Sequence, residues 1–432
     1  MADASIPSRA AREAQFAAEV EANLRRNMIA NFIHGMLGMT GFRIIYAPTL
    51  LPAYLQLISG SAFIVGLGQA LIQLGLLVSP IWSAAALEDK KRILPAAIRF
   101  GTLMRLAVLG IAIAGYLLGG VALVVATLVC LAALGLFNGM QRVAFQMVIS
   151  KLIPTDRRGR LQGARNLMGG AVAAVLSYAA GKYLIDANAL GNGYATTFLF
   201  AFVLTSLGLM ALQWGVVEPD APAVRESVGV RARLRDIPVL MADADYRWFM
   251  VAQGLAMAGR IAAPFYILIA TRTMPLDGTT IGILSLAFLG ADTLSNLAWG
   301  VLGDRHGYRL TFIASLLFVL GGLGLLEFGG TRELTVLAFA CFGIGGAGYG
   351  MAAQTMVLEF GTREDLPMRI ALSTMVEGGV SAVAPLVGGL LLLGAGSDVL
   401  LSVAAVLTVS AIALLIAKVC DPRRREAPVW ED

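Results

Sequence analysis

The sequence GVLGDRHGYR, at residues 300–309, interrupts two long apolar segments, residues 279–302 and 310–329. Gly303 and Gly307 allow the backbone to reverse tightly there, because glycine reaches positive φ at little cost. The acidic and basic side chains of this stretch are costly to place in the hydrocarbon core of a bilayer. The pattern therefore predicts a loop at a membrane surface, with a spanning helix on either side.

The composition agrees with a membrane protein. Hydrophobic residues make up 58% of the 432 residues and charged residues 14%, and the mean hydropathy is +0.76. A soluble protein averages about 45–50% apolar and about 25% charged residues. The apolar segments are too long and too uniform for barrel strands, which alternate over about ten residues. The chain is therefore predicted to be an all-α integral membrane protein, surrounded by membrane lipid.

Twelve transmembrane helices are predicted, in two sets of six. We expect them at residues 27–47, 62–86, 95–118, 121–150, 161–185 and 194–217 in the first half, and at residues 246–270, 279–302, 309–329, 333–358, 367–394 and 397–419 in the second.

The polar segments divide the chain further. Residues 218–245 form a cytoplasmic linker between an N-terminal bundle (27–217) and a C-terminal bundle (246–419). Residues 1–26 are predicted to be a cytoplasmic tail with a short amphipathic helix, and residues 420–432 a second cytoplasmic tail.

The distribution of basic residues tests this topology. Most of the 33 Lys and Arg residues lie in the tails and in the loops that follow even-numbered spans, whereas the opposite loops hold Lys182, Arg272 and Arg332. Cytoplasmic loops carry the excess of Lys and Arg. We therefore expect both termini in the cytoplasm, in an inner or plasma membrane.

Other classes of protein find little support. Cys130, Cys341 and Cys420 lie within or beside apolar segments without metal-ligand spacing, so no metal or cofactor is expected. The basic residues are spread over many loops, which disfavours nucleic acid as a partner. No G-x-x-x-x-G-K loop for ATP is present. An enzyme would need a nucleophile, a metal cluster or an acid–base pair near a surface, and the sequence shows none of these. An enzyme is therefore not expected. We expect a monomer.

Three stretches carry a resemblance to a known family. GVLGDRHGYR follows the loop signature G-x-L-x-D-R-x-G-x-R of the major facilitator superfamily, and SAAALEDKKR (residues 83–92) occupies the same place after the second span, with Asp89 matching Asp304. IPTDRRGRLQG (153–163) resembles the family's loop between spans 4 and 5. The resemblance covers about residues 27–419 and implies two pseudo-repeated six-helix bundles and secondary transport by alternating access.

Two departures from the family's proton-driven drug exporters are visible. Gly135 stands where those proteins carry an arginine in span 4, and the segment at 169–181 lacks their glycine–proline motif. The drug-exporter interpretation is therefore disfavoured.

The resemblance also implies that spans 1, 4, 7 and 10 line a central cavity. The candidate substrate-binding residues on these spans are Arg43, Arg142, Gln141, Gln253, Arg260, Tyr266 and Gln354. Ionisable groups at membrane depth are costly and mark functional sites by default. We hypothesise that Arg260 and Arg142 attract a small anionic or zwitterionic solute.

Three further residues within the spans are candidates for proton coupling, namely Asp292, Glu377 and His34. The alternative is that the charged residues pair with one another to hold the bundle together, and that His34 is a hydrogen-bonded packing residue.

A third set of residues lies at the predicted cytoplasmic surface and is assigned to a gate: Asp89, Arg158, Arg160, Asp304, Arg305 and Arg309. The resemblance implies that Asp304 meets the inner end of span 5, around residues 158–165, when the cytoplasmic side is shut. The alternative is a loop that maintains only the topology.

The predicted function is a secondary active transporter for a small solute, coupled to protons. The alternative is a transporter-like membrane protein that acts as a sensor or assembly factor without transport.

Overall fold

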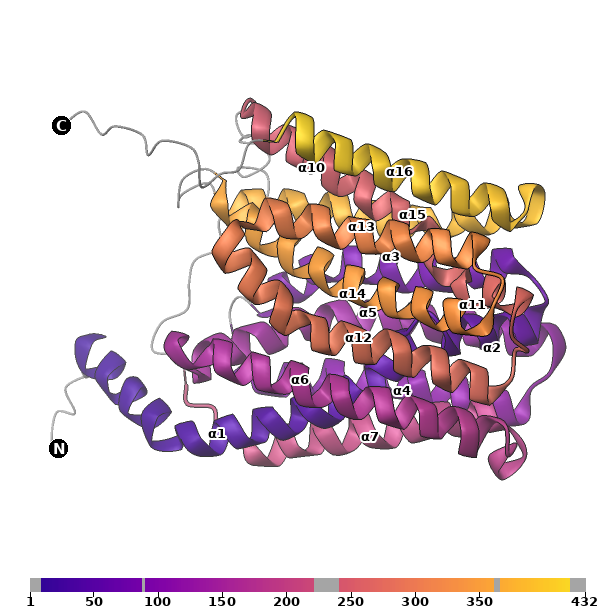
Figure 1. The fold of residues 1–432 in the computed structure, drawn as a ribbon. Helices are drawn as coiled ribbons and strands as arrows, with labels where there is room; N and C mark the ends of the chain where they lie inside the picture. Colours follow the sequence, from indigo (N-terminus) through magenta and orange to yellow (C-terminus); the bar gives the residue numbers. More distant parts are fainter. Residues whose placement is uncertain (1–8, 88–89, 221–240, 361–365, 420–432) are drawn as a thin grey trace, which may run out of the picture.

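The structure is a computed structural model that describes residues 9–87, 90–220, 241–360 and 366–419. Within these ranges, twelve helices are long and apolar enough to cross a membrane. They run side by side along one axis, with the start of α1 and the end of α16 at the same end of the bundle (Figure 1). The predicted all-α architecture with twelve spans is confirmed.

The N-terminal half holds six spans and one short helix. Its elements are α1 (Arg9–Tyr46), α2 (Leu50–Ser59), α3 (Ala62–Leu87), α4 (Leu94–Leu117), α5 (Gly120–Leu152), α6 (Thr155–Ala180) with the π-helical turn η1 (Gly181–Ile185), the 3₁₀ turn η2 (Ala189–Gly191) and α7 (Gly193–Gly215).

The C-terminal half also holds six spans. Its elements are α10 (Ala244–Ala258), continued by η3 (Gly259–Phe265), α11 (Tyr266–Ile269) and η4 (Ala270–Arg272), then α12 (Gly278–His306), α13 (Tyr308–Phe328), α14 (Arg332–Met356) with η5 (Val357–Glu359), α15 (Leu366–Ala395) and α16 (Ser397–Ala417).

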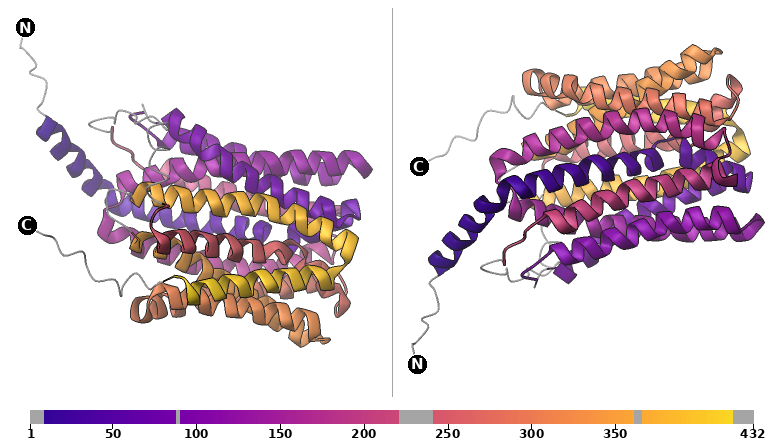
Figure 2. Two further views of the ribbon diagram at one scale, coloured as in Figure 1. Left: turned by 90° about the horizontal axis from the view of Figure 1, so that it is seen from above. Right: turned by 90° about the horizontal axis from the view of Figure 1, so that it is seen from below.

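Two helices differ from the sequence prediction. The short amphipathic helix expected in the N-terminal tail is instead the beginning of α1, which is continuous from Arg9 and projects beyond the other helices (Figure 2). The loop predicted after the first span contains α2, which buries residues such as Leu51 and Tyr54 in the N-terminal core. Ten residues are too few to span a bilayer, so the length of apolar segments in the sequence does not reveal this helix.

The seventh span is not a regular α-helix throughout. The chain adopts 3₁₀ geometry from Gly259 to Phe265, and Pro264 lies within this segment. Proline has no N–H to donate to the carbonyl four residues earlier, which belongs to Arg260. The predicted site residue Arg260 therefore lies within the break in the helix.

The two halves contact each other mainly through two pairs of helices: α3 packs against α15, and α6 packs against α12. Gly66 on α3 lies so close to α15 that a Cβ added there would be 2.2 Å from the carbonyl oxygen of Pro385. At the same end of the bundle, Thr49 hydrogen-bonds to Ser285 (2.6 Å). This end, opposite the termini, is therefore tightly packed.

Candidate functional site

An ion pair joins the two halves, from the last turn of α1 to the middle of α12. Arg43 Nη1 on α1 lies 2.8 Å from Asp292 Oδ2 on α12, and each side chain is 21% exposed. The same Nη1 atom lies 3.4 Å from Thr293 Oγ1. Charged groups removed from water need a partner of opposite sign. Arg43 and Asp292 are each other's partner of opposite charge across the interface between the halves.

A glycine on α6 makes room for this pair. A Cβ added to Gly170 would lie 2.0 Å from Thr293 Oγ1 and 2.9 Å from Arg43 Nη1. The neighbouring residue, Gly169, accepts a hydrogen bond from Thr40 of α1 through its carbonyl oxygen (3.2 Å). Three helices therefore meet at Gly170, a residue that sequence reasoning did not single out. The adjacent glycines at 169 and 170 were the available signal.

A second charged cluster lies in the C-terminal half. The Arg260 guanidinium lies over the ring of Tyr349, 5.6 Å from its centroid. It also acts electrostatically on the carboxylates of both Asp292 and Glu377, while Arg142 acts on Glu377 from the N-terminal half. The structure thus brings Arg260, Asp292 and Glu377 into one electrostatic neighbourhood, together with Arg142.

Tyr349 contributes an unusual hydroxyl to this cluster. Its ring is buried, and its hydroxyl lies among polar side chains. Glu377 and Gln253 are the polar groups near it. A buried hydroxyl needs such neighbours, because leaving it without a hydrogen bond costs free energy.

The other predicted substrate-binding residues fall into two groups. Tyr266 stacks on Phe342 with ring centroids 3.7 Å apart, and Gln253 accepts a hydrogen bond from Ser373 (2.8 Å), so both are buried in helix packing. Gln141 is also buried. Arg142 and Gln354 are exposed at the surface of their helices.

His34 lies apart from these charged residues of the C-terminal half. Its ring packs on Phe145, with centroids 4.9 Å apart, and neither ring nitrogen has a hydrogen-bond partner among the described residues. The nearby cations are Arg105 and Arg165, both buried. Arg105 donates hydrogen bonds to the carbonyl oxygens of Thr205 and Gly101, at 2.7 Å each.

Two of the predicted gate residues bind the ends of helices within their own half. Arg309 donates to the carbonyl oxygens of Leu415 and Ile416 at the end of α16, at 2.9 Å each. Arg158 donates to the carbonyl oxygens of Ile153 and Ser150 at the end of α5.

The remaining gate residues lie at the surface or outside the described part of the chain. Asp304 accepts a hydrogen bond from the hydroxyl of Tyr308 (3.0 Å), and Arg160 and Arg305 are exposed. Asp89 lies outside the described residues.

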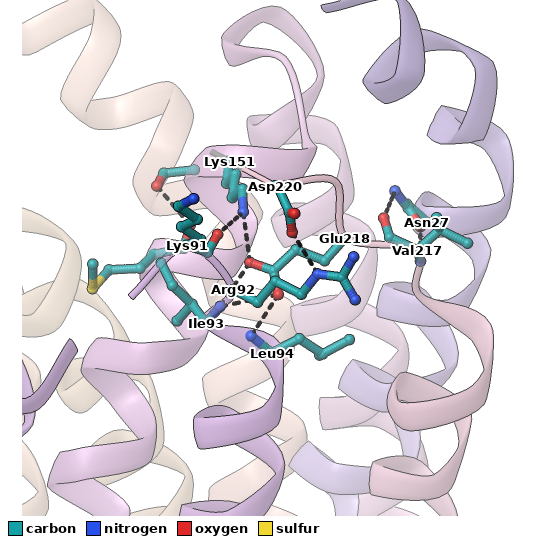
Figure 3. Close-up of polar contacts among 11 residues, drawn as sticks. Asn27, Lys91, Arg92, Ile93, Leu94, Lys151, Val217, Glu218 and Asp220 are labelled. Atoms are coloured by element: carbon teal, nitrogen blue, oxygen red, sulfur yellow. Dashed lines mark hydrogen bonds and ion pairs between the residues drawn. The ribbon is translucent and has the colours of Figure 1, made fainter. Parts of the chain in front are cut away.

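Glu218, just beyond α7, fixes the beginning of α4 (Figure 3). Its carboxylate accepts hydrogen bonds from the backbone N–H groups of Ile93 (2.8 Å) and Leu94 (2.8 Å) and from Lys151 Nζ (2.9 Å). The Glu218 side chain is only 3% exposed. The first N–H groups of a helix have no partner within it and favour a nearby negative charge. Sequence reasoning had treated Glu218 only as the first residue of the linker.

A second ion pair lies beside this carboxylate but remains in water. Arg92 Nε donates to Asp220 Oδ1 at 2.6 Å, and both side chains are about 60% exposed. The hydrogen bond from Arg92 holds the pKa of the Asp220 carboxyl below its usual value.

The far end of the linker is fixed by another acidic residue. Asp243 Oδ1 accepts hydrogen bonds from the backbone N–H groups of Asp245 (3.1 Å) and Tyr246 (3.2 Å) and so caps α10. Its Oδ2 atom lies 3.3 Å from Arg369 Nη1 of α15.

Equivalent helix ends in the two halves are joined by side chains of opposite charge. Glu218 links the end of the sixth span to the beginning of the third, and Arg309 links the beginning of the ninth span to the end of the twelfth. These positions correspond in a chain built from two six-helix repeats.

Comparisons with known proteins agree with this architecture. Residues 248–431 match the sequence family described as Major Facilitator Superfamily. No match is found among curated protein sequences. A solved structure of a mutant nucleoside transporter NupG is similar at a TM-score of 0.73 and 12% identity, covering 90% of this chain and 98% of that one. A D-xylose–proton symporter is similar at a TM-score of 0.70 and 13% identity, covering 94% and 100%.

At such low identity these structures show the shared fold alone. The sequence match is confined to residues 248–431, whereas the fold likeness extends over at least 90% of the chain. The C-terminal half of the chain therefore matches the major facilitator superfamily, and the whole chain shares the twelve-helix fold of these solved transporters.

Proposed function

We propose that this protein is a secondary active transporter that moves a small solute across the cytoplasmic membrane by alternating access. The observation that carries the proposal is the ion pair between Arg43 and Asp292, one residue from each half. Ionisable groups at membrane depth mark substrate and ion pathways. Because the two halves rock against each other in alternating access, a pair across their interface must form and break in the cycle.

The proposed substrate carries a negative charge. Arg260 lies at the break in the seventh span, and its guanidinium faces the Tyr349 ring. Arg43 lies on the other half and is bound to Asp292. A carboxylate or phosphate on the solute would satisfy Arg260 and compete with Asp292 for Arg43, since arginine binds such groups through two parallel hydrogen bonds. An amino group on the same solute would be attracted to Glu377, which makes a zwitterion equally suitable.

Proton coupling follows from the same competition. While Asp292 is paired with Arg43, the positive charge favours its ionised form. When the pair separates, a carboxylate left in a poorly solvated site favours the protonated form. Asp292 is therefore the proposed proton carrier, with Glu377 as the second candidate.

The conformation described here supports a transport cycle. Contacts between the halves gather from the middle of the spans to the end opposite the termini, where Asp186 accepts hydrogen bonds from the Gly278 N–H and the Thr279 hydroxyl. If the termini are cytoplasmic, as the distribution of basic residues predicts, this is a state closed toward the outside. Asp304 is then proposed to act as a latch in the opposite state. Unchanged transport in Asp304→Asn would remove that role.

The direct test is a ligand screen followed by flux measurement. Purified protein is screened by thermal shift against carboxylates, amino acids, sugars, nucleosides and drugs, because a ligand that binds the folded state raises its apparent stability. Ligands that shift the melting temperature are then tested for uptake in proteoliposomes. We expect an organic anion to bind. The Arg260→Gln variant should bind this anion about tenfold or more weakly, because it loses a hydrogen bond to a charged group.

The matched control is Arg247→Gln, at the exposed beginning of the same span. A neutral solute that binds equally well to wild type and Arg260→Gln would contradict the anionic substrate. If every ligand that binds fails to be transported, the alternative function of a sensor without transport is favoured instead.

A further inference from the structure

A groove of about 630 Å³ runs along the N-terminal half between α1 and α7. Its walls are apolar except for two arginines at one end. The lining residues are Ala22, Arg25, Arg26, Ile29, Ala30, Ile33, Met210, Ala211, Trp214 and Gly215. An apolar groove that ends in two arginines matches a molecule with a hydrophobic tail and an anionic head.

The two arginines differ in how they are held. Arg26 donates hydrogen bonds to the carbonyl oxygens of Gly215 and Trp214, at 2.9 Å each, which fixes its guanidinium at the end of α7. Arg25 is exposed, and in the described part of the chain no hydrogen bond or ion pair engages it. It also lines a second, neighbouring groove of about 480 Å³, which Glu21, Leu24, Met28, Ile29 and Arg157 complete. Arg25 is therefore available to an external anion.

The depth of the groove agrees with that occupant. Trp214 lies in the last turn of a spanning helix and is 67% exposed. Tryptophan is enriched where the hydrocarbon core meets the headgroups. Ile29, which is 51% exposed, continues the apolar wall from there toward the membrane interior. The arginines then lie at headgroup level and the apolar wall at the level of the acyl chains.

We propose that this groove binds an anionic glycerophospholipid. Its phosphate contacts Arg25 and Arg26, and an acyl chain lies along Ile29, Ile33 and Met210. The arginines lie at the end of the bundle that carries the termini, which is predicted to face the cytoplasm, where the leaflet is rich in anionic lipid. This lipid site is independent of the solute that the protein transports.

The test is native mass spectrometry of the purified full-length protein with phosphatidylglycerol or with phosphatidylcholine of the same acyl chains. We expect phosphatidylglycerol to bind more tightly. Removal of one basic residue near an anionic headgroup should weaken binding about fivefold, so Arg25→Gln should lower the occupancy by that factor. Arg247→Gln removes the same charge from the same end of the molecule, outside the groove, and should have no effect.

A second variant tests the apolar part. Ala211→Phe fills the wall of the groove without changing charge and should also lower the phosphatidylglycerol occupancy, with a melting temperature close to that of wild type. Equal binding of both lipids would overturn the proposal, as would an unchanged occupancy in Arg25→Gln. Displacement of the lipid by glycerol phosphate alone would show a site for free phosphate and would also overturn it.

Discussion

Gly181 at the end of the fifth span and Gly278 at the beginning of α12 touch through their backbones. A Cβ added to Gly181 would lie 2.1 Å from the carbonyl oxygen of Gly278, and one added to Gly278 would lie 2.2 Å from that of Gly181. Such distances are far inside van der Waals contact. The absence of both side chains therefore allows the two halves to close at this end.

Gly181→Ala should disturb this closure. The added methyl group meets rigid backbone rather than a flexible side chain, so the closed state should lose about 1–3 kcal/mol. The change can be measured as increased labelling of a cysteine introduced at the outer end of α12, and as a lower melting temperature. Gly290→Ala is the matched control, because it lies on α12 with open space around it. Equal labelling of the two variants would contradict the role of the glycine contact.

The ion pair between Arg43 and Asp292 should be energetically coupled. Arg43→Gln and Asp292→Asn should each destabilise the protein, whereas the double variant should lose less than the sum of the two. A coupling free energy of about 1–3 kcal/mol is expected for charged residues in contact. Additive effects in a denaturation cycle would show that the pair contributes no net stability in this conformation.

The proton role of Asp292 has a separate test. Asp292→Asn cannot exchange a proton at that position, so uptake driven by a pH gradient should fall to the level seen without a gradient. Exchange of solute at equal pH should survive. Undiminished pH-driven uptake in this variant would assign the proton to another residue, of which Glu377 is the first to examine.

Gly170→Ala should weaken the same junction without removing a charge. The methyl group would meet Thr293 Oγ1 at 2.0 Å, so we expect a loss of about 1–3 kcal/mol in stability. Thr293→Ala removes the atoms that clash and should restore part of that loss in the double variant. Gly163→Ala, on the same helix but in open space, serves as control. Failure of Thr293→Ala to rescue would point to a different cause.

Glu218→Gln should destabilise the N-terminal half. The buried carboxylate accepts two backbone N–H groups and the Lys151 ammonium, and each hydrogen bond to a charged group contributes about 1.5–3 kcal/mol. The neutral amide leaves Lys151 without its counter-charge, so a lower melting temperature is expected. Asp220→Asn should change it little, because exposed pairs contribute about 0–1 kcal/mol. Similar losses in both variants would contradict the importance of burial.

Most of the fold could be predicted because long apolar segments determine where a chain can cross a membrane. The exceptions depend on information that hydropathy does not contain. The helix α2 is stabilised by burial of Leu51 and Tyr54 against other spans, not by its own length. The 3₁₀ segment in the seventh span could have been anticipated from Pro264, which lies in the printed sequence.

The site was only partly accessible from sequence. Arg43, Arg260, Asp292 and Glu377 could be singled out because charges are rare in apolar spans. Which of them meet could not be predicted, because Arg43 and Asp292 lie 249 residues apart and pair only through the packing of the two halves. The role of Gly170 likewise depends on the approach of α12, which no local pattern specifies.

The two acids that flank the linker have one further consequence. Glu218 completes the N-terminal half and Asp243 caps the first helix of the C-terminal half, so each half has finished ends of its own. Neither half therefore needs an unbroken peptide chain between Glu218 and Asp243 to keep its own structure. Two polypeptides that divide the sequence between Glu218 and Asp243 could be synthesised apart and should assemble in the membrane into a working protein.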